Sequence, residues 1–365
     1  MARRELSSAQ MAVVQAVRSG LPEDASRIVR VRVACSGGAD SLALAVGLAW
    51  LDTHESDPLR ASSALVVDHG LQPGSATVAA GVVDVLQGLG LEASSVRVDV
   101  AADDPDGLEA AARKARFEVL TRGDVDVVLL GHTMDDQAET VLLGLARGSG
   151  IRSLAGMPSS WQMAPGSFSD GLAPLAKPAE GANSSLSEGD DHLARISGLD
   201  DSVRFVRPLL GLRRATTRQA CADWGLTPWD DPMNDDLHFA RVRARQLLPV
   251  MEDALGPGLV EALARTAALA RADADYLDGQ ASAMVSTAST RELPVEVVAA
   301  APDALQGRIV RQWLAGLGVT ELSYERTQAV LALVTDWRGQ GSVDLPGGVR
   351  VARRDGALFL VQVHR

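Results

Sequence analysis

Residues 28–44 contain the feature that most limits what this chain can fold into: an alternating run, a turn of small residues and an Ala/Leu-rich run. Val29, Val31 and Val33 alternate with arginines, which is the period-two pattern of a strand. The run from Leu42 onward is typical of a buried helix. The turn between them, Ser36-Gly37-Gly38-Ala39-Asp40-Ser41, therefore joins a strand to the start of a helix.

This turn has the chemistry of an anion-binding loop. Glycines let a ligand approach the backbone closely, serines offer hydroxyl groups, and the unpaired N–H groups at a helix start favour negative charge. The turn lacks the Gly-Lys-Ser/Thr ending of the common phosphate loop and the three spaced glycines of the dinucleotide-binding motif. An ordinary turn of small residues has the same composition, so the turn by itself leaves both interpretations open.

Strands and helices alternate downstream, which favours an α/β fold with a doubly wound, mostly parallel sheet. We expect strands at 64–67, 95–100 and 126–130 and helices at 5–20, 78–89 and 106–120. Asp68 and His69 follow the strand at 64–67, and ligands bind at this end of the strands in open α/β sheets. A structural turn histidine explains His69 equally well.

The helix expected at 106–120 carries basic residues beside its apolar stripe. Arg113 and Arg116 are three residues apart and share a face, and Lys114 lies next to them. These cations fit either a solvated helix face or a face that contacts phosphate groups.

A cluster of acids follows the strand expected at 126–130. His132, Asp135, Asp136 and Glu139 crowd onto the strand end and the start of the next helix. Thr133 is suited to cap that helix, and the helix dipole favours acids in the first turn. Capping explains one or two of the acids. The whole group can hold an ammonium group, a magnesium ion or both.

Composition narrows the class of protein. The 365 residues, 46% of them hydrophobic, predict two or three domains with a sizeable core. No apolar run is long enough to span a membrane, and the first residues lack the apolar segment of a secretory signal. We therefore expect a cytoplasmic protein with no membrane partner. The two cysteines, Cys35 and Cys221, exclude a disulfide framework and a Cys-x-x-Cys site.

Charge is distributed unevenly along the chain. The formal net charge of -12 argues against non-specific binding of nucleic acid by the whole surface. Residues 204–245 hold eight arginines and five aspartates, a net of +3, so RNA contacts are expected there. Residues 158–203 hold seven acids and two basic residues and little apolar material. This composition predicts a flexible acidic insertion without a functional role.

Together, these motifs resemble the tRNA(Ile)-lysidine synthetase family of pyrophosphate-loop ATP pyrophosphatases. The motifs that carry the resemblance lie, in the family's order, at 36–41, 67–69, 108–117, 131–140 and 145–150, followed by Asp230-Asp-Pro-Met-Asn234 and Arg241-x-Arg243-x-Arg245. A Leu-Pro-Gly-Gly turn at 345–348 is similar to the carboxy-terminal region of the family. One departure is Met233, because the family usually has a serine there.

The resemblance implies a fold of the adenine-nucleotide α-hydrolase-like, pyrophosphate-loop type, in three parts. Residues 1–212 would form the catalytic domain, residues 213–310 a helical domain that contacts tRNA, and residues 311–365 a helix with a small β unit. The implied enzyme is a C–N bond-forming ligase. ATP adenylates O2 of the wobble cytidine in an isoleucine tRNA with a CAU anticodon, and the ε-amine of free lysine then displaces AMP. The lysidine formed lets this tRNA read AUA as isoleucine.

The resemblance also implies roles for individual residues, with ATP and magnesium as cofactors. The loop residues Ser36, Gly37, Gly38, Ala39, Asp40 and Ser41 would hold the pyrophosphate, Asp40 would help bind magnesium, and Asp68 and His69 would border the adenosine. Asp136 and Glu139 would bind the cationic groups of lysine, and His132 or a neighbouring carboxylate would take a proton from the attacking amine. The residues expected to contact tRNA are Arg113, Lys114, Arg116, Arg207, Arg241, Arg243 and Arg245.

Two rival interpretations are weaker. A tRNA thiolase of the same superfamily would need cysteines that carry sulfur or ligate a cluster, and this chain has only Cys35 and Cys221. A non-catalytic RNA-binding module with a regulatory nucleotide site would be favoured if Asp40 or the acids at 135–139 were missing, and they are present. The sequence leaves the oligomeric state open, and a homodimer is compatible with it.

Overall fold

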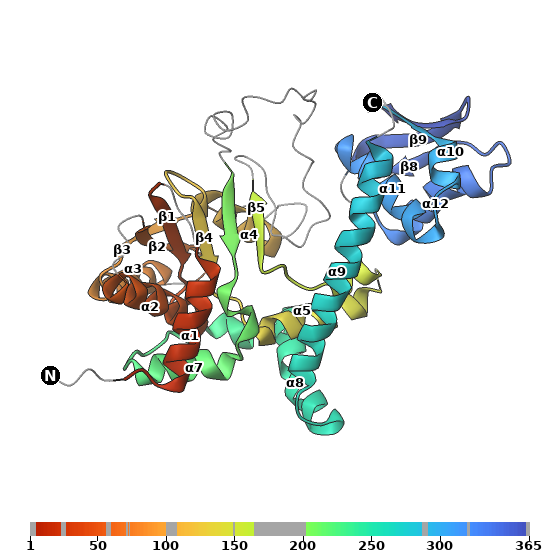
Figure 1. The fold of residues 1–365 in the computed structure, drawn as a ribbon. Helices are drawn as coiled ribbons and strands as arrows, with labels where there is room; N and C mark the ends of the chain where they lie inside the picture. The colour runs from red at the N-terminus through yellow and green to blue at the C-terminus, as the bar shows by residue number, and fades with distance from the viewer. Residues whose placement is uncertain are drawn as a thin grey trace, which may run out of the picture. The chain divides into compact units, whose positions relative to one another are not determined.

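The computed structural model of this chain describes residues 5–22, 27–55, 60–70, 72, 74–99, 108–148, 150–163, 202–286, 291–319 and 322–362 (Figure 1). The helices are α1 (Ser8–Gly20), α2 (Ala39–His54), α3 (Ser75–Gly88), α4 (Leu108–Leu120), α5 (Met134–Arg147), α6 (Ile151–Leu154), α7 (Arg214–Asp223), α8 (Ala240–Leu255), α9 (Leu259–Val285), α10 (Val295–Ala299), α11 (Asp303–Gly316) and α12 (Tyr324–Thr335). The strands are β1 (Val29–Ala34), β2 (Arg60–Asp68), β3 (Glu92–Arg97), β4 (Val127–Leu130), β5 (Ser160–Met163), β6 (Val203–Val206), β7 (Glu292–Pro294), β8 (Val343–Leu345), β9 (Val349–Arg354) and β10 (Ala357–Gln362).

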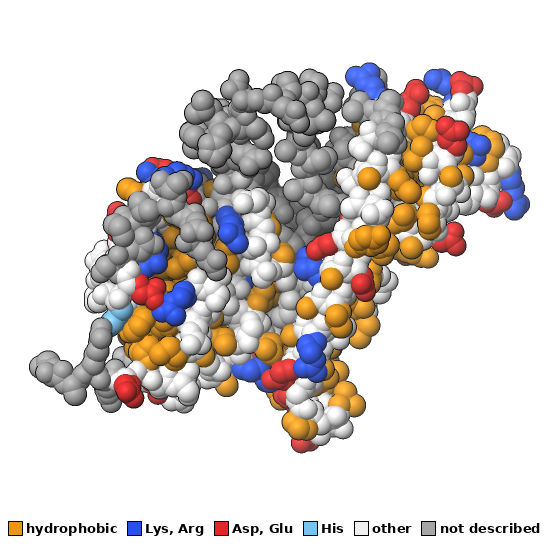
Figure 2. Space-filling model, viewed as in Figure 1, with side chains coloured by type: hydrophobic (Ala, Val, Ile, Leu, Met, Phe, Trp, Pro, Cys, Tyr) orange, Lys and Arg blue, Asp and Glu red, His pale blue; other side chains and the backbone are white. Residues whose placement is uncertain are grey.

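The chain divides into two compact units. The described residues of the first unit fall within 5–147, 156–163 and 202–267, and those of the second fall within 148–155 and 268–362. None of the helices in the described ranges has both the length and the apolar character needed to cross a membrane. On the face drawn in Figure 2, acidic and basic side chains are interspersed.

The first unit is built on a six-stranded sheet in the order β3-β2-β1-β4-β6-β5. All pairs are parallel except β5 with β6, which confirms the predicted mostly parallel sheet. β1 is central, so that Val31 pairs with Ser62 of β2 on one side and with Val127 of β4 on the other. The strand order reverses between β1 and β4, and the crevice beyond their carboxyl ends is where such sheets bind ligands.

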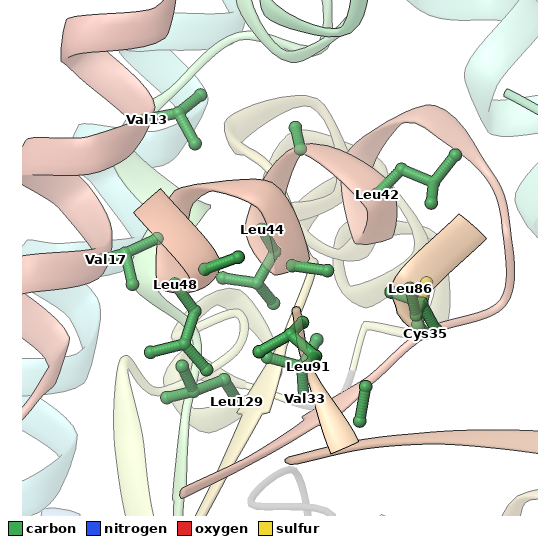
Figure 3. Close-up of a cluster of buried hydrophobic side chains, with 14 of the residues drawn as sticks. Val13, Val17, Val33, Cys35, Leu42, Leu44, Leu48, Leu86, Leu91 and Leu129 are labelled. Atoms are coloured by element: carbon green, nitrogen blue, oxygen red, sulfur yellow. The ribbon is translucent and has the colours of Figure 1, made fainter. Parts of the chain in front are cut away.

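Helices cover both faces of this sheet. On one face, Val13 and Val17 of α1 and Leu44 and Leu48 of α2 pack with Val33 of β1 (Figure 3). The opposite face has a second buried cluster, which includes Phe117 of α4, Val128 and Leu130 of β4 and Phe205 of β6. Because successive residues of β4 alternate between the two clusters, this strand is apolar throughout, as a strand covered on both faces must be.

Several predicted segments have different bounds in the structure. The strand expected at 64–67 is longer and runs over Arg60–Asp68. The third strand was expected at 95–100 and lies at Glu92–Arg97, because it pairs along β2 and the ladder ends where β2 ends at Asp68. The acidic insertion was expected from 158 to 203, but β5 occupies Ser160–Met163 and β6 begins at Val203. Trp161 of β5 stacks on Phe205, with ring centroids 4.9 Å apart, which holds this edge strand in place. Residues 164–201 lie outside the described residues.

The second unit contains the small β structure expected near the carboxyl end. Its four-stranded antiparallel sheet has the order β7-β10-β9-β8. Asp355 and Gly356, with φ of 51° and 80°, form the hairpin turn between β9 and β10. The buried side chains of α11 and α12 pack in one cluster with Val351 of β9 and Leu358 of β10.

The expected domain boundaries at 212 and 310 do not coincide with these units. α7 belongs to the first unit because Ala220 and Cys221 are fully buried in the same cluster as α1 and α2. α11 begins before residue 310 and belongs to the second unit, because Ile309 and Trp313 pack in the cluster of the small sheet.

The aromatic cluster on the sheet's second face gives a test of the fold. Phe205 is fully buried and lies between Phe117 and Trp161. We expect Phe205→Ala to lower the free energy of unfolding by about 3–5 kcal/mol, because the cavity left beside the two remaining rings cannot collapse fully. Chemical denaturation measures this change. Leu145→Ala, at a side chain that is 62% exposed, is the matched control and should cost less than about 0.5 kcal/mol.

Candidate phosphate-loop and carboxylate site

The loop between β1 and α2 is closed by its own hydroxyl groups. The Ser36 N–H donates to the Ser41 Oγ at 3.1 Å, and the Ser41 hydroxyl donates to the Gly38 carbonyl oxygen at 3.0 Å. Gly37 has a φ of +87°, and a Cβ atom at this position would lie 2.5 Å from the Cγ2 atom of Val82. Only glycine therefore fits here, and the loop approaches α3 closely.

A second segment packs against this loop. The Trp229 N–H donates to the Gly37 carbonyl oxygen at 3.0 Å. Asp231 accepts hydrogen bonds from the Met233 N–H at 2.9 Å and from the Gln72 side chain at 2.8 Å. The Asp231 carboxylate thus caps the turn at 232–235, and residue 233 contributes only its backbone N–H to that cap. Methionine at this position therefore keeps the capping interaction.

A close backbone contact brings the end of β4 to the same loop. A Cβ atom at Gly131 would lie 3.0 Å from both the N and the Cα atoms of Ser41. Glycine allows this approach because it has no side chain. The acids that follow β4 are therefore placed directly beside Asp40 at the start of α2.

Three carboxylates converge on the guanidinium of Arg214, which is the first residue of α7. Arg214 Nη2 donates to Asp136 Oδ1 at 2.8 Å and to Glu139 Oε1 at 3.1 Å. Its Nε lies 3.4 Å from Asp40 Oδ2, and the Thr217 hydroxyl donates to the other oxygen of Asp40. The structure therefore joins the loop aspartate and two acids of α5 in one ion-pair network.

Glu139 is fully buried at the centre of this network. Its Oε1 also accepts from Arg245 Nε at 2.9 Å. Its Oε2 lies 3.9 Å from Arg241 Nε and has no hydrogen-bond donor among the described residues. A buried carboxylate oxygen without a donor is costly, so it is a favourable position for a cationic ligand.

The electrostatic environment treats two of these carboxylates differently. Burial raises the pKa of Asp40 to about 6, and the nearby Asp136 adds to the rise, although the Thr217 hydroxyl and Arg214 oppose it. Burial also works against the charge of Asp136, but Arg214 and two hydrogen bonds from Thr133 outweigh it and lower the pKa of Asp136. Asp136 is thus a permanent anion, whereas Asp40 titrates close to neutral pH.

His132 is held neutral beside this network. Burial, followed by the charge of Arg207, lowers the pKa of His132 well below its usual value. Arg207 Nε donates to His132 Nδ1 at 3.2 Å, so the ring proton is assigned to Nε2. Arg207 is itself buried, donates to the Pro158 carbonyl oxygen at 2.8 Å and lies 4.1 Å above the ring of Trp161.

Other predicted site residues lie on neighbouring strands and helices. Asp68 is buried and accepts from the Gly70 N–H at 2.9 Å. The Nδ1 atom of His69 is buried without a hydrogen-bond partner in the described structure, and burial and Arg116 lower the pKa of its imidazole. Arg113 and Arg116 each lie 5.9 Å from the ring of Phe117, and Lys114 is exposed.

The predicted RNA-contacting arginines of α8 have different surroundings. Arg245 binds Glu139, and Arg241 Nη2 donates to the Thr140 hydroxyl at 3.1 Å. Arg243 donates to the backbone carbonyl oxygens of Leu237 and His238. Arg241 and Arg245 thus compensate the charge of α5, which their spacing in the sequence did not indicate.

The sequence reasoning missed Arg214 and Thr217. One signal was present: Arg213 and Arg214 begin a helix, where the helix dipole disfavours cations. A cation at that position requires compensation by nearby acids, and the acids of α5 provide it.

The described residues contain no group of three or more His, Cys, Asp or Glu side chains that could hold a metal ion. Magnesium, however, usually takes one or two protein carboxylates together with substrate phosphates and water. Asp40, at the phosphate loop and close to Asp136, fits that pattern. Both cysteines are buried, and burial raises the pKa of each thiol, that of Cys221 to about 11. Neither is suited to carry sulfur as a thiolate.

The raised pKa of Asp40 predicts how stability depends on pH. The folded state binds a proton more readily than the unfolded chain, so the ionised carboxylate costs stability as pH rises from 3.8 through about 6. We expect Asp40→Asn to be at least as stable as the parent at pH 8, by up to roughly 3 kcal/mol, and to lose this advantage below about pH 4. Thermal unfolding at several pH values measures the difference. A variant that is less stable at pH 8 and equal at pH 5 would contradict the assignment.

Comparisons with known proteins give matches over most of the chain. Residues 9–251 match the family model described as a PP-loop domain, and residues 293–359 match that of the TilS substrate binding domain. The tRNA(Ile)-lysidine synthase of Leifsonia xyli subsp. xyli is 45% identical over 342 residues, which cover 90% of this chain and 88% of the relative. That of Rhodococcus erythropolis is 44% identical over 340 residues, which cover 91% and 89%.

A solved structure has a similar fold. It is the U34-tRNA thiolase NcsA from Methanococcus maripaludis with its 4Fe-4S cluster, and it has a TM-score of 0.50 at 17% identity. The match covers 71% of this chain and 78% of that chain. At this identity the likeness concerns the fold alone.

Proposed function

The chain belongs to the tRNA(Ile)-lysidine synthase family, and from that premise we propose that it ligates lysine to the wobble cytidine of an isoleucine tRNA with a CAU anticodon. ATP adenylates O2 of the cytidine and releases pyrophosphate. The ε-amine of lysine then attacks C2, the C2–O bond to the adenylate breaks, and AMP leaves.

The observation that carries this proposal is the buried Oε2 atom of Glu139, which accepts no hydrogen bond from the described residues. The other oxygen of the same carboxylate already binds a cationic side chain, that of Arg214. The guanidinium of Arg214 is held by Asp40, Asp136 and Glu139. Such a site favours an amino acid with a cationic end over a neutral one, because buried carboxylates attract a cation more strongly than carboxylates in water do. We therefore propose that Asp136 and Glu139 bind the cationic groups of lysine.

The phosphate loop lies directly beside these acids, which suits ATP as the activating substrate. The proposed pyrophosphate-binding residues are Ser36, Gly37, Gly38, Ala39, Asp40 and Ser41. We further propose that Asp68 and His69 border the adenosine, since the buried Nδ1 of His69 can accept a hydrogen bond. Asp40 would hold magnesium, which neutralises charge on the phosphates when it is bound.

The attacking amine must be neutral, and the proposal needs a group that accepts its proton. His132 is poorly suited, because its pKa is depressed and its Nδ1 lone pair already accepts from Arg207. A carboxylate of the network is the better acceptor. We propose that His132 donates a hydrogen bond through Nε2 and that Arg207, supported by Trp161, keeps it in this tautomer.

For tRNA, the proposed contacts are Arg113, Lys114 and Arg116 on α4 and Arg241, Arg243 and Arg245 on α8. Arg207, which was also expected to contact tRNA, is buried against Trp161 and His132 and is not proposed as a contact. Residues 213–310 remain the segment proposed to contact tRNA.

The cytoplasm is the proposed location, since the tRNA pool is there. A homodimer is the proposed assembly. Leu247, Val250 and Leu255, in the carboxyl-terminal half of α8, are exposed apolar residues, and Figure 2 shows hydrophobic atoms where α8 ends. Sedimentation velocity tests this assembly.

The direct test of the proposed function is incubation of the protein with ATP, lysine and a CAU-anticodon isoleucine tRNA transcript. Mass analysis of the nucleosides should show that one cytidine has gained lysine with loss of water. Omission of ATP or of lysine should abolish the product. Unmodified cytidine in the complete reaction, with a folded protein, would refute the proposal.

Glu139→Gln tests the lysine site. We expect the lysine concentration for half-maximal AMP release to rise about 30-fold or more, since about 2 kcal/mol or more is lost when one charge of a buried pair is removed. Asp135→Asn is the matched control. It removes the same charge one turn earlier on α5. There, Asp135 accepts from the backbone N–H of Arg214, whereas Glu139 accepts from the guanidinium group of Arg214. If both variants keep the parental lysine midpoint and only melt at a lower temperature, these acids merely stabilise the helix start.

A further inference from the structure

One cavity in the first unit, of about 330 Å³, is lined by Arg214, Ala215, Arg218 and Arg245. We propose that this cavity binds a phosphate group, and that the group belongs to the backbone of the tRNA. Neither Arg218 nor the cavity belongs to the phosphate loop, and Arg218 has no role in the proposed chemistry of lysine or ATP.

The local structure explains why three cations meet here. Arg214 and Arg218 are four residues apart on α7, so their side chains share a helix face. Arg245 projects from α8, and Ala215 leaves room between them because its side chain is a methyl group. The four lining residues include no acid. The first turn of α7 also lies at the cavity, where the helix dipole favours an anion.

The three guanidinium groups differ in how much of their charge is already compensated. Arg214 and Arg245 direct N–H groups to Glu139 and Asp136, so part of their charge is already compensated. Arg218 is exposed, and within the described ranges its side chain makes no hydrogen bond or ion pair. An arginine has five N–H donors in a fork that matches phosphate oxygens, so Arg218 supplies a ready donor set.

The position of the cavity favours tRNA as the source of the phosphate. Arg214 and Arg245 contact both the cavity and the carboxylates proposed to bind lysine. The reacting nucleotide must reach those carboxylates, so its neighbouring phosphates must pass close by. ATP already has a phosphate cradle in the loop at 36–41. Naming tRNA as the source rests on the proposed function, whereas the phosphate site itself rests on the arginines alone.

Arg218→Ala tests the site in the full-length protein. We measure the tRNA dissociation constant between roughly 50 and 300 mM salt by filter binding. Each phosphate contact contributes about 0.7–0.9 to the slope of log affinity against log salt, so the slope should flatten by about one. Arg218→Lys, which keeps the charge, should restore most of the slope. A melting curve verifies that each variant is folded.

The matched control is Arg122→Ala. Arg122 is also exposed, but it precedes the amino end of β4, whereas the site lies beyond the carboxyl ends of β1 and β4. Its loss removes the same charge, and the slope should remain parental. If both variants flatten the slope equally, the effect is one of net charge and the proposed site is wrong.

A parallel titration with ATP and with inorganic pyrophosphate distinguishes the sources. Unchanged ATP and pyrophosphate binding in Arg218→Ala, together with a flatter tRNA slope, supports the proposal. Weaker binding of ATP with a parental tRNA slope would overturn tRNA as the source. No change in either would overturn the phosphate site. Nucleoside analysis with the parent protein decides the proposed function separately, since a parent that binds tRNA but forms no lysidine refutes the function and leaves the slope test intact.

Discussion

The ion-pair network around Arg214 is the interaction on which the site depends. Asp136 and Glu139 are removed from water by the packing of α5, and an isolated carboxylate in such surroundings would be strongly unfavourable. Arg214 and Arg245 make their burial tolerable from two different helices. If α7 or α8 moved away, a buried carboxylate would lose its arginine and leave an uncompensated charge. The network therefore also holds α7 and α8 against the end of the sheet.

Compensation by arginine gives the site a chemical bias. The network holds its anions in place without a bound ligand, and every acceptor oxygen that remains open then favours a cation. Glu139 Oε2 is such an atom. The same burial acts in the opposite direction on Asp40, whose pKa of about 6 lets it change charge near neutral pH. One environment therefore produces a permanent anion at Asp136 and a titratable group next to the phosphate loop.

The far edge of the sheet contributes through a chain of contacts. Phe205 and Phe117 support Trp161, Trp161 lies against Arg207, and Arg207 fixes the protonation state of His132. The short edge strand β5, whose sequence resembles part of a polar insertion, thereby helps to set the protonation state of His132. The aromatic side chains of this cluster hold the Arg207 side chain in one orientation, because packed aromatic rings have few rotamers and little freedom to move.

The sequence by itself determined the local features: the strand-to-loop-to-helix unit at 28–44, the alternation that specifies a mostly parallel sheet, and the acids that begin α5. These depend on neighbours within one element, so periodicity and glycine chemistry reveal them. Only the tertiary structure decided the partners. Arg214 lies 174 residues from Asp40, and nothing in either local pattern indicates their contact. Arg241 and Arg245 were predicted to contact RNA, and because α8 packs against α5 both also pair with Glu139, a contact that their spacing in the sequence does not indicate. Burial and helix packing, which no local pattern contains, set both the pairing and the pKa values.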